Sequence, residues 1–444
     1  MTQSSARQGE SHLLLPNTDI EDMARVLAPL SRHLVSDGYD AALDALASRF
    51  PMRIHAYPTG ISAFTWIVPE RWLCREAALE TLDGQKIFSA EDNLLHVVSY
   101  SLPFSGTVSR EELFAHLHTP PAPAAERCPD AIPFVFKYYD RDWGLCCSAR
   151  QKAALTADTY RVRIDSAFSA GAVKVGEVLV TGQRKDCIVF CAHLCHPGQF
   201  NDGLSGVLAG LKLTERLQRR SNLRYSYRML ILPETIGSAC WLSHNPDVIP
   251  QLKGGLFLET LATAYPHVLM HSNQPTSWFD RLCTVVLRHE NAGNTDVPFL
   301  GSLLNDERMF NATGIQCPMC SLMRVAPRSD DLWPYATYHT SLDVCENADF
   351  ANLQKSIDLL EQIVNATEAD CVPRPLWQGE LFVSRYNGLD YERDGKILRE
   401  ITYSMDGKRS INDIAQLRNA DFFEIKRVLD ILAEEGLVTH EACL

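Results

Sequence analysis

The sequence predicts an α/β fold with a mainly parallel sheet flanked by helices. Three observations predict it. From residue 188 to residue 366, strand-like apolar runs alternate with helical patterns. The first run, residues 188–192, is apolar throughout, which is typical of a parallel strand covered on both faces. Polar residues then follow several of the strands, where open α/β sheets bind ligands.

Length and composition set the broad class. A chain of 444 residues exceeds one ordinary core, so two or three domains are expected. The hydrophobic content of 46% and charged content of 22% are typical of a soluble globular protein, and the formal net charge of -13 argues against a nucleic-acid binder. No apolar run of about 18 residues indicates a membrane span. The 14 scattered cysteines and the polar start of the chain favour a reduced, cytoplasmic protein.

The N-terminal half predicts helices and then a β-rich insertion. Residues 1–18 are expected to form a loose arm. A helical pattern starts after Asp19, with a break expected at Pro29, and a second helix is expected at 39–49. Short strands are expected at 63–68, 97–100 and 133–136, punctuated by prolines. We therefore assign 19–52 and 155–372 to the α/β core and 53–154 to a small β-rich insert domain.

Within the core, alternation continues to residue 366. The sequence predicts half-exposed strands at 160–164 and 173–180 and further strands at 188–192, 228–233, 255–259 and 267–271. Helices are expected at 204–218, 239–242, 277–290 and 350–366. Strands and helices that alternate in this way favour a mainly parallel sheet.

Residues 373–444 predict a winged helix. Ser410 and Asp421 are expected to cap two helices, Gly436 ends the second, and a strand follows at 437–439. From residue 376 onward, nine Lys and Arg face thirteen Asp and Glu. Because DNA contact normally needs a basic face, we expect this unit to pack on the core or to mediate self-association as a homo-oligomer.

Candidate chemistry lies on loops that follow strands. His193, His196 and Asp202 follow the strand at 188–192, and imidazole plus carboxylate is the ligand set of catalytic zinc. Glu234 and Glu259 follow or end later strands, and His339 lies on another loop. A single such residue is more often a helix cap, a solvated residue or a hydrogen-bonded core residue. The prediction of a metal site therefore depends on the whole set of residues. The lone CxxC at 317–320 favours packing over metal binding.

Four short motifs, in order, resemble those of the zinc exopeptidase superfamily. They are His193-Leu-Cys-His196-Pro-Gly, Asn201-Asp202-Gly-Leu-Ser-Gly206, Pro233-Glu-Thr-Ile-Gly-Ser238 and Tyr338-His-Thr-Ser341. The resemblance covers residues 160–366 and is greatest to aminopeptidases with two co-catalytic zincs, in particular bacterial three-domain proteins with an inserted β domain and a C-terminal winged helix. It implies a phosphorylase/zinc-peptidase-like sheet.

The resemblance also implies roles for five residues. His193 is similar to the histidine of the first metal, and Asp202 to the carboxylate that bridges both metals. Glu259 stands where the superfamily has an acidic ligand of the first metal, and His339 matches the histidine of the second. Glu234 matches the general base, which would take a proton from water activated by the metal.

Two departures change the expected metal content. Thr235 replaces a glutamate that ligates the second metal, and Cys195 replaces an aspartate that orients the first histidine. We therefore expect one tight zinc, or another divalent metal, and a second ion that is weak or absent. His196 is either a further ligand, a substrate contact or a locally hydrogen-bonded loop residue. Tyr338 and Arg324 are weaker candidates for substrate contacts, and for Arg324 a surface or ion-paired role is favoured.

The sequence thus predicts a metal-dependent aminopeptidase or amidohydrolase. Its substrate would be a short peptide or an aminoacyl small molecule, cut at the amide bond next to a free amino group. The alternative is a catalytically weakened binding or regulatory protein with the same fold, which Thr235 and Cys195 motivate. A winged-helix transcription regulator is the third hypothesis, and its acidic C-terminal unit argues against it.

Overall fold

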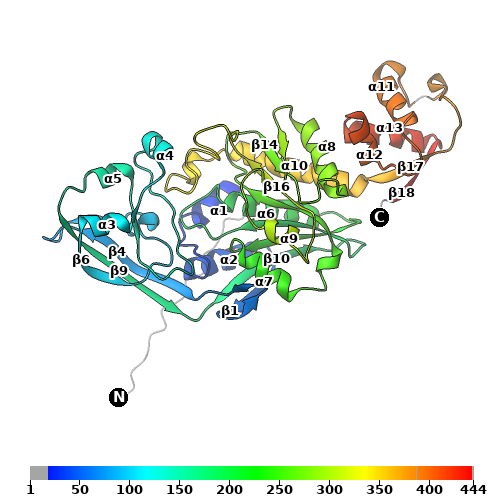
Figure 1. Ribbon diagram of the computed structural model, residues 1–444. Coiled ribbons are helices and arrows are strands. Elements are labelled where there is room, and N and C mark those ends of the chain that lie inside the picture. Colours follow the sequence, from blue (N-terminus) through cyan, green and yellow to red (C-terminus); the bar gives the residue numbers. More distant parts are fainter. Residues whose placement is uncertain (1–18, 387, 443–444) are drawn as a thin grey trace.

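The computed structural model describes residues 19–386 and 388–442, and its centre is a mixed sheet of eight strands (Figure 1). The arm expected at residues 1–18 lies outside the described residues. The strands lie in the order β1 (Arg53–Pro58), β10 (Ala172–Val180), β12 (Ser226–Leu232), β11 (Cys187–His193), β13 (Leu252–Glu259), β16 (Met319–Arg324), β14 (His267–Met270) and β15 (Thr295–Val297).

The middle of this sheet is parallel, as the sequence predicts. β12, β11, β13 and β16 run in the same direction, whereas β10, β1 and β14 pair antiparallel to their inner neighbours. Every residue of β11 is buried, which explains its continuous apolar run. Because parallel strands end at the same edge of a sheet, the residues that end β11 and β13 and follow β12 meet there.

Helices cover both faces of the sheet. Met229 and Arg228 are neighbours in β12, so their side chains point to opposite faces. Gly210 of α6 abuts Met229, whereas the Arg228 guanidinium lies 5.9 Å from the ring centroid of Trp241 in α7. α10 packs with both α6 and α8, and α9 packs with α7. The helices are α1 (Ile20–Leu27), α2 (Asp37–Arg49), α6 (Leu204–Gln218), α7 (Ile236–His244), α8 (Trp278–Glu290), α9 (Glu307–Asn311) and α10 (Phe350–Ala369).

The helices at the N-terminus follow their capping signals. The Asp19 side chain accepts a hydrogen bond from the Glu21 N–H group at the start of α1. α1 ends at Leu27, two residues before Pro29, so the break expected at this proline is confirmed.

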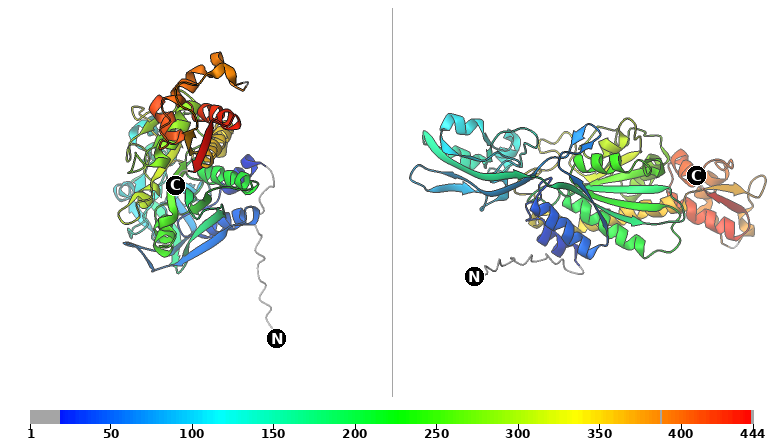
Figure 2. Two further views of the ribbon diagram at one scale, coloured as in Figure 1. Left: turned by 90° about the vertical axis from the view of Figure 1, so that its right-hand side faces the viewer. Right: turned by 90° about the horizontal axis from the view of Figure 1, so that it is seen from below.

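A second, antiparallel sheet lies at the opposite end of the molecule from the C-terminus, as Figures 1 and 2 show. Its order is β5 (Lys86–Ser89), β4 (Arg71–Glu80), β9 (Thr159–Ser169), β6 (Phe104–Ser109). β9 leads into β10 of the large sheet through two residues, so consecutive strands join the two sheets. β1 pairs in the large sheet and β9 in the small one, which differs from the expected division at residues 53 and 154. The domain boundaries stay a prediction.

Three strands expected between residues 63 and 136 are wrong. The first is a hairpin of two-residue strands, β2 (Ser62–Ala63) and β3 (Trp66–Ile67), because Phe64 turns the chain with a φ of 54°. Residues 97–100 and 133–136 form only isolated bridges. Their apolar side chains pack in a small cluster instead, and Pro133 has no N–H group to donate to a ladder. The short elements nearby are η1 (Leu94–His96), α3 (Arg110–Ala115), β7 (Leu117–His118), α4 (Ala122–Arg127), β8 (Leu145–Cys146) and α5 (Ala149–Ala153).

The C-terminal unit pairs β17 (Cys371–Pro375) with β18 (Val438–Ala442) around α11 (Tyr391–Thr402), α12 (Ile411–Arg418) and α13 (Phe422–Glu434). Ser410 and Asp421 cap α12 and α13, as predicted, whereas α11 was not predicted. The unit contacts the core through Asp370, which accepts hydrogen bonds from the Trp278 indole and the Asn412 N–H group. Its assignment as a winged helix, without nucleic-acid contact, stays a prediction.

The structure also tests the expectations for the cysteines and for membrane-spanning helices, over the residues that it describes. The thirteen cysteines in this part of the chain are free thiols, and Cys317 and Cys320 are buried in the apolar core. Among the described helices, none combines the length and apolar character that crossing a bilayer requires. The remaining short helices are η2 (Ile249–Gln251), η3 (Cys345–Asn347) and η4 (Val383–Arg385).

Candidate metal centre

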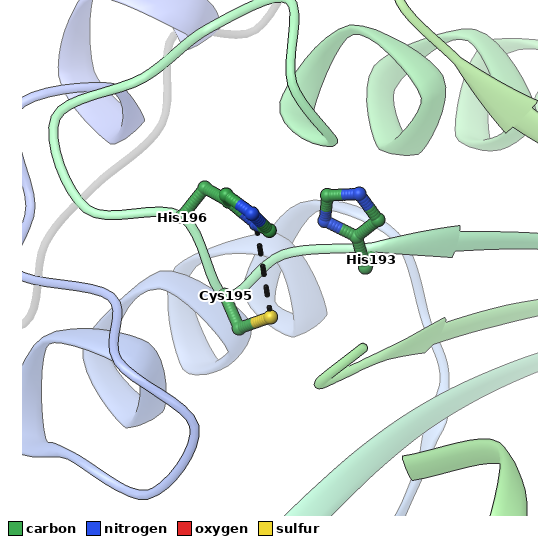
Figure 3. A group of neighbouring side chains, drawn as sticks. All are labelled: His193, Cys195 and His196. Carbon is green, nitrogen blue, oxygen red and sulfur yellow. Dashed lines mark hydrogen bonds between the residues drawn. The ribbon is translucent and has the colours of Figure 1, made fainter. Parts of the chain in front are cut away.

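The loop after β11 brings two histidines together. Figure 3 shows His193 at the end of β11 and His196 on the loop beyond it, with their ring centroids 4.5 Å apart. Cys195 lies between them in sequence, and its Sγ is 3.9 Å from His196 Nδ1. The same sulfur accepts a hydrogen bond from the Glu234 N–H group at 3.1 Å. Cys195 therefore connects the histidine loop to the segment that follows β12.

Asp202 is fixed by backbone contacts at the start of α6. The Asp343 carboxylate accepts hydrogen bonds from the N–H groups of Asn201 and Asp202, at 3.0 and 2.9 Å. Gly203 has a φ of 93°, and a Cβ atom there would lie 2.3 Å from His193 Nδ1. Glycine is thus required at this position both by the backbone conformation and by the approach of the imidazole.

Arg32 fixes the loop at 194–199, which carries His196, through hydrogen bonds to its backbone. It is fully buried, and its guanidinium donates to the carbonyl oxygens of Leu194 (3.0 Å), His196 (2.6 Å) and Gln199 (2.6 Å). It also donates to carbonyl oxygens at the end of α1. Burial lowers the pKa of Arg32 to about 10, so the guanidinium stays charged at neutral pH.

His193, Asp202 and Glu259 form a first potential ligand group. His193 Nε2 lies 3.2 Å from Asp202 Oδ1 and 3.3 Å from Glu259 Oε1. Two ligands about 2.1 Å from a tetrahedrally coordinated ion lie about 3.4 Å apart, so these separations fit a divalent metal such as zinc. The second Glu259 oxygen accepts a hydrogen bond from Asn305 Nδ2 at 2.5 Å, which fixes the carboxylate.

His196, Asp202 and His339 form a second group that shares Asp202 with the first. His339 Nε2 lies 2.8 Å and His196 Nε2 3.7 Å from Asp202 Oδ2. Within the described chain, His196 Nε2 is buried without a hydrogen-bond partner. Buried polar atoms are normally satisfied, so an imidazole nitrogen without a partner beside the Asp202 carboxylate fits a bound cation.

The pKa values of these residues are set by burial and by their contacts with one another. Burial would raise the pKa of Asp202, but the histidines around it outweigh this effect, with His339 in direct contact, and hold that pKa well below its usual range. Burial lowers the pKa of His196, so its imidazole is neutral and has a lone pair to donate. Burial raises the pKa of Glu259, which a cation at the carboxylate would oppose. Burial would lower the pKa of His193, but Asp202 and neighbouring groups raise it.

Glu234 lies beside both groups. Its Oε2 is 3.9 Å from His196 Nε2, and its side chain is 25% exposed, which leaves it open to water and substrate. Burial raises the pKa of Glu234 above that of an ordinary glutamate, as expected of a general base that works near neutral pH. The next residue, Thr235, donates its N–H group to Asp306 Oδ1 at 2.8 Å, and its hydroxyl contacts Arg308.

The structure brings six of the eight predicted site residues into one cluster: His193, His196, Asp202, Glu234, Glu259 and His339. Tyr338 joins its edge, where the ring stacks on His339 with centroids 4.0 Å apart. Arg324 does not reach the cluster, because its guanidinium is buried and donates to Ser356 Oγ and the Tyr265 carbonyl oxygen.

Sequence reasoning missed the residues that position the ligands. Arg32, Asn305 and Asp343 are buried and contact the cluster from distant parts of the chain. Asp343 lies four residues after His339, so its nearness to that motif was the one local signal. For Arg32 and Asn305, no pattern in the sequence near them indicates the contact.

Comparisons with known proteins extend this picture. Residues 21–370 match the sequence profile of a family described as a domain of unknown function, DUF4910. The chain belongs to this family. A relative from Clostridium acetobutylicum is 30% identical over 425 residues, which cover 93% of this chain and 94% of the relative. Its provisional name is polysaccharide biosynthesis protein with aminopeptidase-like domain.

Solved structures agree on the fold of this DUF4910 protein. The crystal structure of a provisionally named peptidase from Clostridium acetobutylicum has a TM-score of 0.84 and 29% identity, covering 95% of this chain and 96% of that one. A zinc aminopeptidase from Bacillus subtilis has a TM-score of 0.56 and 14% identity, covering 80% and 95%. The fold is therefore that of the zinc peptidases, as the motifs predict.

Proposed function

We propose that this DUF4910 protein is a metal-dependent amide hydrolase of the aminopeptidase type. The observation that carries the proposal is the pair of three-residue ligand groups that share Asp202, with Glu234 open to solvent beside them. His193, Asp202 and Glu259 would hold the first ion. A bound metal would act as a Lewis acid and lower the pKa of water. Hydroxide, the stronger nucleophile, would then be available at neutral pH to attack an amide carbonyl.

The protein's own residues then have defined tasks. Glu234 takes the proton from the attacking water on a carboxylate oxygen and delivers it to the leaving amine, since its raised pKa suits both transfers. Asn305 and Asp343 keep Glu259 and Asp202 in place during the reaction. The aromatic rings of Phe134 and Tyr338 contact His339 and hold its imidazole in position.

We further propose that His196 replaces the missing carboxylate at Thr235 as a ligand of a second ion. The side chain of Thr235 contacts Arg308, whereas His196 faces Asp202 and His339. This favours two ions over the single tight ion that the sequence suggests. Titration of zinc into chelator-treated protein tests it, with the bound metal counted by mass spectrometry. Two equivalents are expected in the wild type and one in His196→Ala, and a single equivalent in both would contradict the second site.

Hydrolysis is tested on a panel of aminoacyl anilides, dipeptides and aminoacylated amino sugars. The amino sugars are included because the Clostridium relative is named for polysaccharide biosynthesis. The zinc-loaded wild type is expected to hydrolyse at least one of them, about 100-fold or more faster than Glu234→Gln, since general bases contribute about that much. Glu111→Gln, at an exposed position in α3, is the matched control and should keep full activity. Equal rates in wild type and Glu234→Gln on every substrate would refute hydrolysis.

The second candidate is a binding or regulatory protein that has lost catalysis. The replacements at Cys195 and Thr235 favour it, because they remove two groups that the superfamily uses around its metals. Metal content distinguishes the candidates. Purification without chelator should give at least one ion per chain for the hydrolase, and well below one for the weakened protein.

A further inference from the structure

A cavity beside Glu234 combines aromatic walls with an uncompensated cation. Its volume is about 390 Å³, enough for a small substituent such as an amino-acid side chain or a sugar ring. Phe64 and Trp66 of the β2–β3 hairpin form one wall, and Arg308 and Met309 of α9 form the other. Thr235, which directly follows the proposed base Glu234 in the sequence, also lines this cavity.

Arg308 is held in place without being neutralised. Its Nε donates to the Asn305 carbonyl oxygen at 3.0 Å, and its Nη2 lies 3.5 Å from Thr235 Oγ1. Within residues 19–386 and 388–442, this exposed guanidinium forms no ion pair within 4.0 Å. Its charge acts at longer range on Glu234 and Glu307, where it opposes the rise of their pKa values that burial causes. The nearest acids in the sequence are occupied elsewhere, since Asp306 accepts from Thr235 and Ser238, and Glu307 from the Asn305 N–H group.

The position of this cation relates it to the proposed reaction. Asn305 donates to Glu259 and accepts from Arg308, so one short segment contacts both the first ligand group and the cavity. In a dipeptide, the carboxylate carbon of the leaving amino acid lies within about 4 Å of the scissile carbonyl carbon, by standard bond lengths. Arg308 contacts the residue next to the proposed base, so we expect its guanidinium to reach an anionic group that lies this close to the cut bond.

We propose that Arg308 binds an anionic group on the leaving side of the substrate, with Phe64 and Trp66 packing on its apolar part. The inference rests on the proposed function. It narrows the substrate class to aminoacyl compounds whose leaving amine carries a carboxylate or a phosphate near the nitrogen. A guanidinium pairs with either group through two parallel N–H donors, which explains why arginine rather than lysine suits this position.

Paired substrates test the inference. A dipeptide with a free carboxylate is compared with its C-terminal amide and with the same aminoacyl group on 2-aminoethyl phosphate. The wild type should prefer one of the anionic substrates over the amide by at least 10-fold in kcat/KM, and the preferred one identifies the anion. In Arg308→Gln this preference should fall to about 1 while the amide is still cleaved. Arg219→Gln, at an exposed position after α6, is the matched control and should keep the preference.

The ratio of kcat/KM between the anionic substrate and the amide separates direct binding of the anion by Arg308 from an indirect effect of its charge on Glu234. If Arg308 acted only by its charge on Glu234, its replacement would slow all three substrates by the same factor, and that result would overturn the proposal. Trp66→Ala should weaken binding of every leaving group through KM and leave the preference for the anion unchanged. Equal kcat/KM for acid, phosphate and amide in the wild type would also overturn the proposal, while the hydrolase function would stand.

Binding measured without turnover keeps the two proposals distinguishable. Calorimetric titration of the dipeptide and its amide into Glu234→Gln should show at least 10-fold tighter binding of the acid, lost in Glu234→Gln/Arg308→Gln. Tighter binding of the acid together with no hydrolysis in the wild type would refute the hydrolase and support the anion site. Equal binding of acid and amide would refute the anion site.

Discussion

Arg32→Lys tests whether a buried guanidinium fixes the proposed metal centre. Arg32 has no exposed surface and donates to the carbonyl oxygens of Leu194, His196 and Gln199, besides two at the end of α1. Lysine keeps the charge but has three donors instead of five and no planar fork. At least two carbonyl groups would therefore lose their partner in a site closed to water.

The cost follows from those unpaired groups. Each buried carbonyl left without a donor costs about 1–3 kcal/mol, so two of them cost about 2–6 kcal/mol. Folded domains have a net stability of only about 5–15 kcal/mol. With an unfolding entropy of about 0.7 kcal/mol/K for a unit of this length, Tm should fall by about 3–8 °C. The freed loop should also bind zinc more weakly, since His196 is one of the residues whose carbonyl is released.

Thermal melts and zinc competition against a chelator measure both effects. Arg32→Lys should show the lower Tm and at least 10-fold weaker binding of the ion that depends on His196. Arg219→Lys, with a side chain 75% exposed, is the control and should change neither quantity. A Tm within 1 °C of the wild type together with unchanged zinc affinity would refute the view that Arg32 organises the loop.

Two further predictions concern a glycine and a histidine. Gly203→Ala should cost more than about 2 kcal/mol in urea unfolding and abolish metal binding, because its Cβ would lie 2.3 Å from the imidazole that ends β11. Gly198→Ala, also at positive φ but with no atom within 4 Å, should cost less and keep the metal. His271→Asn tests pH dependence: hydrogen bonds with Asp280 and Asp296 raise the pKa of His271, so its charged form stabilises the fold. The stability difference from wild type should be largest below pH 6.5, at about 1–2 kcal/mol, and should fall as pH rises through the raised pKa. A difference that stays constant from pH 5.5 to 9 would contradict it.

The core was predictable from local patterns. The helix expected at 204–218 is observed over the same residues, and the strand expected at 188–192 extends by one residue at each end. Long amphipathic segments are identified by their periodicity, and a short, fully apolar run is identified as a buried strand by its length and flanking residues. In the structure, α6 packs against β11 and β13, so the apolar face predicted for this helix lies on the sheet.

The insertion was less predictable because its apolar runs do not pair as strands. Residues 97–100 and 133–136 have the composition of strands, but Tyr100 has a φ of 65° and ends any extended run there. Val98 and Phe134 are buried by packing although they belong to no strand, and burial does not distinguish a strand from a buried loop. A short apolar run therefore predicts burial well and secondary structure poorly.

The candidate site likewise contains residues that the sequence predicts and residues that it does not. The residues proposed as metal ligands end or follow strands, and His193 and Asp202 lie in short motifs. This is why His193, Asp202 and Glu259 could be proposed from the sequence. Residues that hold them act across long sequence separations: Arg32 contacts the loop at 194–199, and Asn305 contacts Glu259. No local signal marks such contacts, because a buried arginine or asparagine has the same neighbours in sequence as a surface one.

Backbone strain gives an independent reason to regard the cluster as functional. Thr235, Thr260 and His339 all have positive φ, between 52° and 61°, a region that β-branched residues rarely adopt. The two threonines directly follow the acids of the cluster. Each strained residue is held by a backbone hydrogen bond, for example from the Thr260 N–H group to the Asn201 carbonyl oxygen at 3.1 Å. Strain of about 1–3 kcal/mol at each position persists only where the surroundings impose it. Other non-glycine residues with positive φ, such as Asn222 and Asn419, lie elsewhere in the described chain, but these three lie directly beside the proposed ligands and base, where strain is expected of a functional site.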